Sequence, residues 1–229
     1  MIVVITTARP DGSSHLADTL RAIDSSATSE RRVVLVDGDA VPSVPPEWSV
    51  SNFQKPPNKG GQNKWVTWRA FELASEAGED LLFFEDDIAL CKGAVRYMER
   101  MEVPRDVAFV SLYDPYGGTV DGRPWGLWRA RMHVYSYCQA LKVPLRTCRI
   151  LAAGVDEMRE TLRFGGSDDT LRDFGRPRNW LYAIHVPGLV QHVGVKSCVG
   201  TQGLEGSRVS RSYPGDHFNA LSLRHWQFD

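Results

Sequence analysis

Three consecutive carboxylates, Glu85-Asp86-Asp87, directly follow the apolar run of residues 81–84. Such a run is typical of a strand buried on both faces, so the triplet is expected at the carboxyl end of a central strand, where open α/β sheets bind ligands. Adjacent carboxylates repel one another unless a cation or a donor compensates, and their oxygens suit Mn²⁺ or Mg²⁺. The triplet therefore predicts a divalent metal site, with a solvent-facing acidic turn as the alternative.

A histidine late in the chain is the second candidate metal ligand. His192 ends an apolar, strand-like segment and is followed closely by Gly194. A neutral imidazole can complete the shell of a Mn²⁺ ion. Lys196 and Ser197 come soon after and are candidates for contacts with a diphosphate. The alternative for His192 is a structural, hydrogen-bonded histidine.

A pair of carboxylates, Asp168-Asp169, follows Ser167, which is a plausible N-cap for a short helix. Acidic side chains in a first helical turn complement the helix dipole, and this alone explains their position. The functional alternative is that one of the two carboxylates is a general base. Either would be ionised near neutral pH, as a base must be.

The loop after the first expected strand, residues 6–10, lacks both a Gly-x-Gly-x-x-Gly pattern and a Walker sequence. A dinucleotide enzyme and a P-loop kinase are therefore disfavoured. Arg9 is placed to pair with a phosphate, or is a surface cation. Asp37, at the end of the second expected strand, is placed to accept from a base or ribose, or forms a turn.

Strand and helix patterns alternate along the first half of the chain. Strands are expected at residues 2–5, 32–36, 81–84 and 107–112, and apolar residues at helical spacing predict helices around 16–23 and 66–77. This alternation predicts an α/β fold with a mostly parallel sheet flanked by helices. Residues 42–61 and 113–131 read as long loops, and 137–143 as a further strand before Pro144.

Size and composition limit the possibilities further. The chain has 229 residues, with 27 Lys and Arg against 28 Asp and Glu, so its overall charge points to no polyanionic partner. No apolar run reaches the roughly 18 residues of a transmembrane helix, and the N-terminus lacks a signal-peptide pattern. Four scattered cysteines favour reduced thiols, and we expect a cytoplasmic protein.

Two stretches resemble known glycosyltransferases. Residues 62–65 and 83–88 together are similar to the core of GT-A-fold enzymes, in which a helix precedes a strand that ends in an acidic "DXD"-type motif. The motif Glu-Asp-Asp-Ile at residues 85–88 resembles that of the N-acetylglucosaminyltransferase IV family. Residues 137–144 resemble a segment of the lipopolysaccharide and collagen glycosyltransferase family. The resemblance implies that Asp87 and His192 bind the metal directly, whereas Glu85 reaches it through water or touches the donor ribose.

This resemblance implies a single GT-A-like domain over residues 1–229. Residues 1–110 would bind a nucleotide sugar, 111–200 would shape the acceptor site, and 201–229 would be a polar tail. The implied reaction is transfer with inversion from a UDP-sugar to an acceptor hydroxyl, with Asp169 as the general base and Asp168 in reserve. The implied donor-binding residues are Thr6, Thr7, Arg9, Asp37, Asn63, Lys64, Asp86, Lys196 and Ser197.

The sequence leaves alternatives open for both the acceptor and the class of reaction. Between residues 121 and 149, aromatic side chains are interleaved with six Lys and Arg. This pattern suits an anionic acceptor, including DNA with a hydroxymethylated base, or it is a set of ordinary solvated cations. A glycan or a small molecule is the other class of acceptor. A metal-dependent nucleotidyltransferase or nuclease, and a non-catalytic nucleotide-sugar-binding module, are the alternative functions.

Overall fold

An eight-stranded sheet forms the centre of the computed structural model, which describes residues 1–7, 15–25, 31–39, 41–54, 62–114, 125–135, 138–157, 166–193, 210 and 212–223. The strand order is β3-β2-β1-β4-β8-β6-β9-β7. The strands are β1 (Ile2–Thr7), β2 (Arg31–Asp37), β3 (Ser49–Phe53), β4 (Leu81–Glu85), β6 (Val107–Ser111), β7 (Gly126–Arg131), β8 (Ala140–Val143) and β9 (Leu181–Val186).

Most of these strands run the same way. β3, β2, β1 and β4 pair in parallel, as do β6 and β9, whereas β8 and β7 pair antiparallel with their neighbours. The predicted α/β fold with a mostly parallel sheet is therefore confirmed. A second, two-stranded sheet pairs β5 (Ile88–Leu90) with β10 (Val190–His192) antiparallel.

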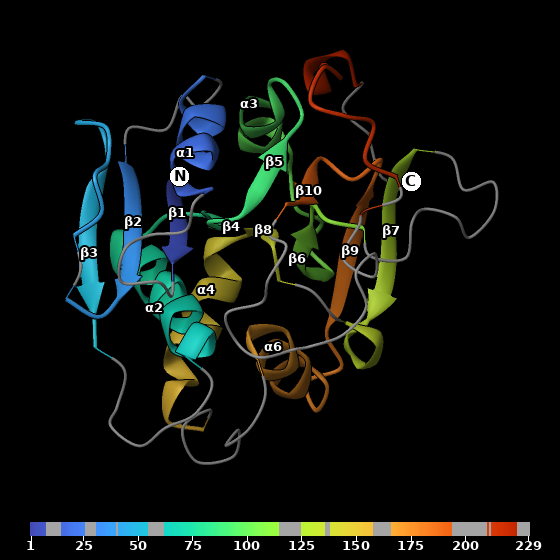
Figure 1. Ribbon diagram of the computed structural model, residues 1–229. Coiled ribbons are helices and arrows are strands. Elements are labelled where there is room, and N and C mark those ends of the chain that lie inside the picture. Colours follow the sequence, from blue (N-terminus) through green and yellow to red (C-terminus); the bar gives the residue numbers. More distant parts are fainter. Residues whose placement is uncertain are drawn as a thin grey trace.

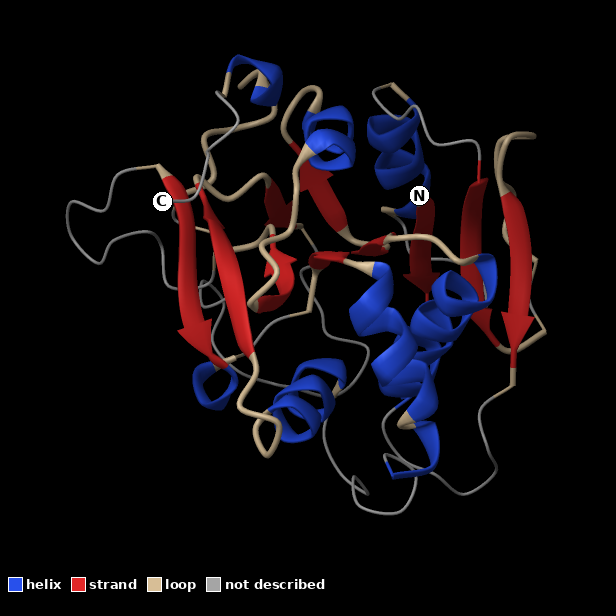
Figure 2. Ribbon diagram, turned by 180° about the vertical axis from the view of Figure 1, so that it is seen from behind, coloured by secondary structure: helices blue, strands red, loops and turns tan. Residues whose placement is uncertain are grey.

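Helices cover both faces of the large sheet (Figure 1). One apolar cluster lies between the sheet and α2 (Gln62–Ala77), α4 (Leu145–Ala153) and α6 (Ser167–Gly175). The other lies between the sheet and α1 (Leu16–Asp24) and α3 (Ala94–Arg100). Figure 2 shows the same layers from behind. Two short 3₁₀ turns, η1 (Met132–Val134) and η2 (Ala220–Ser222), complete the described elements.

Periodicity predicted the central elements correctly because they bury their apolar residues. Leu16, Leu20 and Ile23 are all buried on one face of α1. All four residues of the run 81–84 have no exposed surface, so β4 is covered on both faces as expected. The apolar run before the triplet is thus a central strand, with β1 on one side and β8 on the other.

Two strands lie where long loops were predicted, and those predictions were wrong. β3 falls within residues 42–61, and β7 falls within 113–131. Both are the edge strands of the large sheet, and both are only partly buried. An edge strand has one paired side and a polar, half-exposed surface, so it lacks the apolar pattern that identifies a central strand.

The C-terminal segment was predicted as a polar tail with few apolar anchors, and its described part does not behave in that way. Ala220 and Leu223 are buried against the apolar cluster that contains α3. The main chain of Lys92, before α3, is hydrogen-bonded to the carbonyl of Asp216 and the amide of Ala220. The segment therefore packs on the fold, although its sequence offers few apolar residues to show this.

Candidate metal centre

The acidic triplet begins at the carboxyl end of β4, as the sequence predicted. The amide of Glu85 donates to the carbonyl of Gln139 at 2.9 Å, so this strand end is tied to the segment that leads into β8. On the other side, Thr6 of β1 is in register with Glu85. Both neighbours restrict the point at which the acidic side chains leave the sheet.

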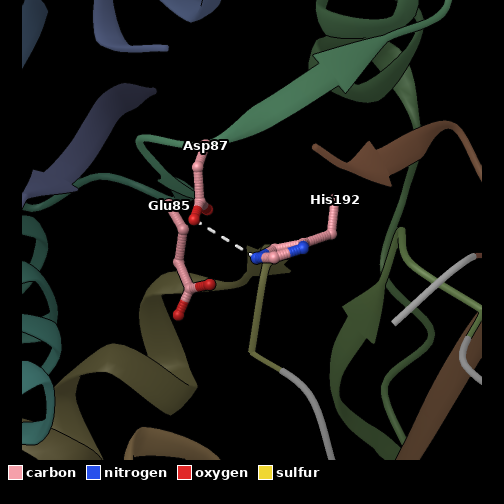
Figure 3. A group of neighbouring side chains, drawn as sticks. All are labelled: Glu85, Asp87 and His192. Carbon is pink, nitrogen blue, oxygen red and sulfur yellow. Dashed lines mark ion pairs between the residues drawn. The ribbon is translucent and has the colours of Figure 1, made fainter. Parts of the chain in front are cut away.

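The small sheet brings His192 to the triplet. Ile88 of β5 pairs with His192 of β10, and the amide of Val193 donates to the carbonyl of Asp87 at 2.9 Å. As a result, Nε2 of His192 lies 3.2 Å from Oδ2 of Asp87. Figure 3 shows the imidazole turned toward this carboxylate, with the side chain of Glu85 beside it.

Glu85, Asp87 and His192 each offer one ligand atom within 4.8 Å of the others. Adjacent ligands of an octahedral ion at about 2.1 Å are separated by about 3 Å, which matches the distance between Asp87 and His192. Two carboxylates and one imidazole are also an appropriate donor set for Mn²⁺. The three residues therefore fit a divalent ion, and among the described residues no fourth carboxylate or histidine belongs to this group.

The third member of the triplet lies apart from this group. Asp86 is only 9% exposed, and its carbonyl oxygen accepts a hydrogen bond from the Thr19 hydroxyl of α1. The predicted contact of Asp86 with a donor stays a prediction. Glu85 and Asp87 are half-buried, with access to the space between them and His192.

Three of the predicted donor-binding residues lie along one edge of the sheet. Thr6 and Thr7 end β1, and Asp37 ends β2. These strands run parallel to β4, so their carboxyl ends reach the edge that carries Glu85. This edge is where α/β sheets bind ligands.

Of the other predicted donor-binding residues, two lie on α2 and three lie outside the described residues. Asn63 and Lys64 lie in the first turn of α2. Lys64 is only 2% exposed, and its Nζ lies 5.6 Å from the centre of the Trp65 ring. Arg9, Lys196 and Ser197 lie outside the described residues, so their predicted roles stay predictions.

The two carboxylates of α6 have different surroundings. Oδ1 of Asp169 lies 2.7 Å from a guanidinium nitrogen of Arg172, and Oδ2 accepts from the amide of Gly166 at 3.4 Å. Asp169 thus has the structural role that its position in a first turn suggests. Gly166, and not Ser167, is the N-cap, and the Ser167 hydroxyl instead lies 2.8 Å from that of Thr67 in α2.

The charge of Asp168 acts on two buried groups near the acidic strand end. Burial raises the pKa of the Cys138 thiol well above its ordinary value, and the charges of Glu85 and Asp168 raise it further. Burial likewise raises the pKa of Tyr135, with contributions from Cys138 and Asp168. The charges of Glu85 and Asp168 thus both act on the pKa of Cys138.

Sequence reasoning did not single out Thr19, Cys138 or Gln139, which surround the acidic strand end. Gln139 and Cys138 are at least nine-tenths buried, and Thr19 is completely buried. Only the position of residues 138–139 within the strand expected over 137–143 hinted at their location; the described strand β8 begins at Ala140. Nothing in the spacing of Thr19 linked α1 to the triplet.

Three of the described cations of the aromatic and basic stretch are engaged by the chain itself. Lys142 is buried and donates to main-chain carbonyls at the end of α3. Arg146 donates to carbonyls of the loop between α3 and β6, and Arg129 pairs with Asp106. Trp125 is 50% exposed. These contacts favour ordinary structural and surface roles over a phosphate-binding face.

No protein-family model matches the chain, and no curated protein matches it. Among solved structures, the galactosyltransferase LgtC, in complex with donor and acceptor sugar analogues, has a TM-score of 0.46 at 13% identity, over 76% of this chain and 70% of that one. The glycosyltransferase GlyE of Streptococcus pneumoniae TIGR4 has a TM-score of 0.46 at 8% identity, over 78% of this chain and 44% of that one.

A mannose-1-phosphate geranyltransferase from Thermus thermophilus has a TM-score of 0.40 at 11% identity, over 80% of this chain and 72% of that one. Overlaps this weak assign no family, so the functional argument depends on the chain's own geometry. Separately, no helix in the described ranges combines the length and the apolar character needed to cross a membrane.

Proposed function

We propose that this protein is a metal-dependent glycosyltransferase of the GT-A type, which moves a sugar from a nucleotide-sugar donor, a UDP-sugar by resemblance, to an acceptor hydroxyl. The observation that carries the proposal is the meeting of Asp87 and His192, from two distant segments, beside Glu85 at the carboxyl end of a central strand. Asp87 and His192, with Glu85, would hold a divalent ion there, which would supply Lewis-acid stabilisation to a leaving diphosphate.

The edge of the sheet next to the three ligands is the proposed donor site. The ends of β1 and β2 contribute Thr6, Thr7 and Asp37, and α2 contributes Lys64 in its first turn. A lysine near a diphosphate would offset its charge, and hydroxyl and carboxylate groups would bind the hydroxyls of the nucleoside. Arg9, Asn63, Asp86, Lys196 and Ser197 are kept in the proposed donor site on the basis of sequence.

The proposed general base is one carboxylate of the pair at the start of α6. Asp169 is engaged by Arg172 and Gly166, whereas the charge of Asp168 acts on Tyr135 and Cys138 beside the strand end. Because Asp169 is paired with Arg172, we take Asp168 as the first candidate and Asp169 as the second, the reverse of the order that the sequence suggested. The base would take the proton of the acceptor hydroxyl as its oxygen attacks the anomeric carbon, with inversion.

Release of UDP from a panel of UDP-sugars, with candidate glycan and small-molecule acceptors, tests the function directly. We expect release that requires Mn²⁺ and stops on addition of a chelator. The Asp87→Asn variant should release UDP only at the rate of the chelated protein, because it loses a charged ligand. Asp106→Asn, which breaks a surface ion pair with Arg129, is the matched control and should keep the full rate.

Three outcomes would contradict the proposal. Mn²⁺-independent release, or an unchanged rate for Asp87→Asn, would remove the metal from the reaction. Binding of UDP without turnover of any donor would favour the non-catalytic module. A hydroxymethylated DNA acceptor is tested in the same assay, and its binding should weaken steeply with salt if it is used.

A further inference from the structure

A threonine of α1 contacts the acidic triplet from outside the sheet. Thr19 has no exposed surface, and it lies on the buried face of the helix. Its hydroxyl oxygen lies 3.1 Å from the carbonyl oxygen of Asp86 and 3.0 Å from that of Ile88. A helical threonine often bonds a carbonyl one turn back in its own helix. The single hydroxyl hydrogen of Thr19 is instead shared between two carbonyls of another segment, which is a specific tertiary contact.

The two carbonyls that Thr19 binds flank Asp87. The carbonyl of Asp87 itself accepts from the amide of Val193, next to His192. Three successive carbonyl groups are therefore held in place. The Thr19 hydroxyl holds those of Asp86 and Ile88, and the amide of Val193, which follows β10, holds that of Asp87. Because the main chain is fixed on both sides of Asp87, the direction of its carboxylate is restricted.

We propose that Thr19 is a positioning residue, which holds the Asp86–Ile88 main chain so that Asp87 faces His192 before an ion binds. This inference rests on the proposed metal site. Without an ion, the carboxylates of Glu85 and Asp87 repel each other, and a freely moving turn would let them separate. A turn held by Thr19 avoids that reorganisation, as do other residues that orient metal ligands through hydrogen bonds.

The Mn²⁺ affinity of the whole protein, measured by electron paramagnetic resonance of free Mn²⁺, tests this role without any substrate. Thr19→Val keeps the shape of the side chain and removes the hydroxyl. We expect its Mn²⁺ affinity to fall by about 10- to 100-fold, the usual effect of losing a residue that orients a ligand. Thr19→Ser restores the hydroxyl and should restore an affinity close to that of the unaltered protein.

Thr147→Val is the matched control, since Thr147 is also buried but lies on α4. It should leave Mn²⁺ affinity unchanged. If Thr19→Val does not fold, as judged by circular dichroism, Thr19→Ala is compared with Thr19→Ser, and only the serine variant should bind with normal affinity.

The two hypotheses fail in different ways. Normal affinity in a folded variant without the Thr19 hydroxyl would overturn the role of Thr19 and leave the metal site intact. An equal loss in Thr147→Val would also overturn it, because any buried hydroxyl would then matter. Absence of Mn²⁺ binding by the unaltered protein would overturn the metal site and, with it, this inference.

Discussion

The neighbouring carboxylates Asp168 and Asp169 have different surroundings, although they are the same residue type. Asp169 completes the first turn of α6 through Gly166 and is paired with Arg172, and these contacts hold it in place. The charge of Asp168 instead acts on the buried Tyr135 and Cys138. A carboxylate held by a guanidinium, as Asp169 is, is less suited to act as a general base.

Replacement of each carboxylate by its amide separates these roles. Asp168→Asn should keep UDP binding and lower turnover by about 100-fold or more, as expected for loss of a general base. Asp169→Asn should lower the stability of the protein by about 1 kcal/mol through weaker capping, with a much smaller effect on turnover. Calorimetry with UDP, steady-state rates and thermal unfolding measure the three quantities. A normal rate for Asp168→Asn together with a large loss for Asp169→Asn would reverse the assignment.

At the scale of elements, the close approach of α4 and α6 positions the helix that carries Asp168. A Cβ atom added at Gly154, which ends α4, would lie 2.3 and 2.4 Å from ring atoms of Phe174 in α6. Contacts this short cannot persist, and Phe174 is buried with Trp68 of α2 against its ring. Glycine is therefore required for space at this position.

We predict that Gly154→Ala lowers the free energy of unfolding by about 1–3 kcal/mol, because overpacking forces side chains or helices to move. Urea unfolding measures the change. Gly126→Ala is the matched control, since an added Cβ there meets no atom within 4 Å, and it should leave stability nearly unchanged. Substitution of Phe174 by leucine in the Gly154→Ala background should recover part of the loss. No recovery would show that the ring is not the source of the strain.

At the scale of the whole molecule, one buried histidine makes the stability of the fold depend on pH. His185 of β9 has no exposed surface. Its Nδ1 donates to the carbonyl of Pro187 at 2.7 Å, and its Nε2 accepts from the hydroxyl of Tyr97 in α3 at 3.1 Å. Burial lowers the pKa of His185 from 6.5 to about 4 in spite of the bond to Pro187, so the folded protein keeps the ring neutral.

Acid should therefore destabilise the protein as a whole. Between pH 6.5 and about 4 the unfolded chain binds a proton at His185 that the folded chain does not, so the free energy of unfolding falls as the pH falls. The contribution is about 3 kcal/mol over that interval. Urea unfolding from pH 8 to pH 4.5 measures it. His185→Gln should be less stable at pH 8 and should show a shallower loss in acid; a pH dependence equal to that of the unaltered protein would assign the effect to other groups.

The amino-acid sequence was sufficient to predict β1, β2, β4, β6 and β8, the two principal helices of the first half and the acidic strand end, but not the interior strand β9. Those features depend on local patterns, because a fully buried run such as residues 81–84 and a helical stripe such as that of α1 are visible in the order of residues. Glu85, Asp87 and His192 could be named as candidate ligands because their residue types suit a divalent ion and because the segments resemble GT-A enzymes.

Long-range packing decided the rest. Whether His192 lies beside Asp87 depends on the pairing of β5 with β10, and neither short strand indicates its partner. The edge strands, the contact of Thr19 with the triplet and the different surroundings of Asp168 and Asp169 likewise come from segments far apart in the chain. Such contacts form only when the complete core is buried, so the identity and spacing of nearby residues do not determine them.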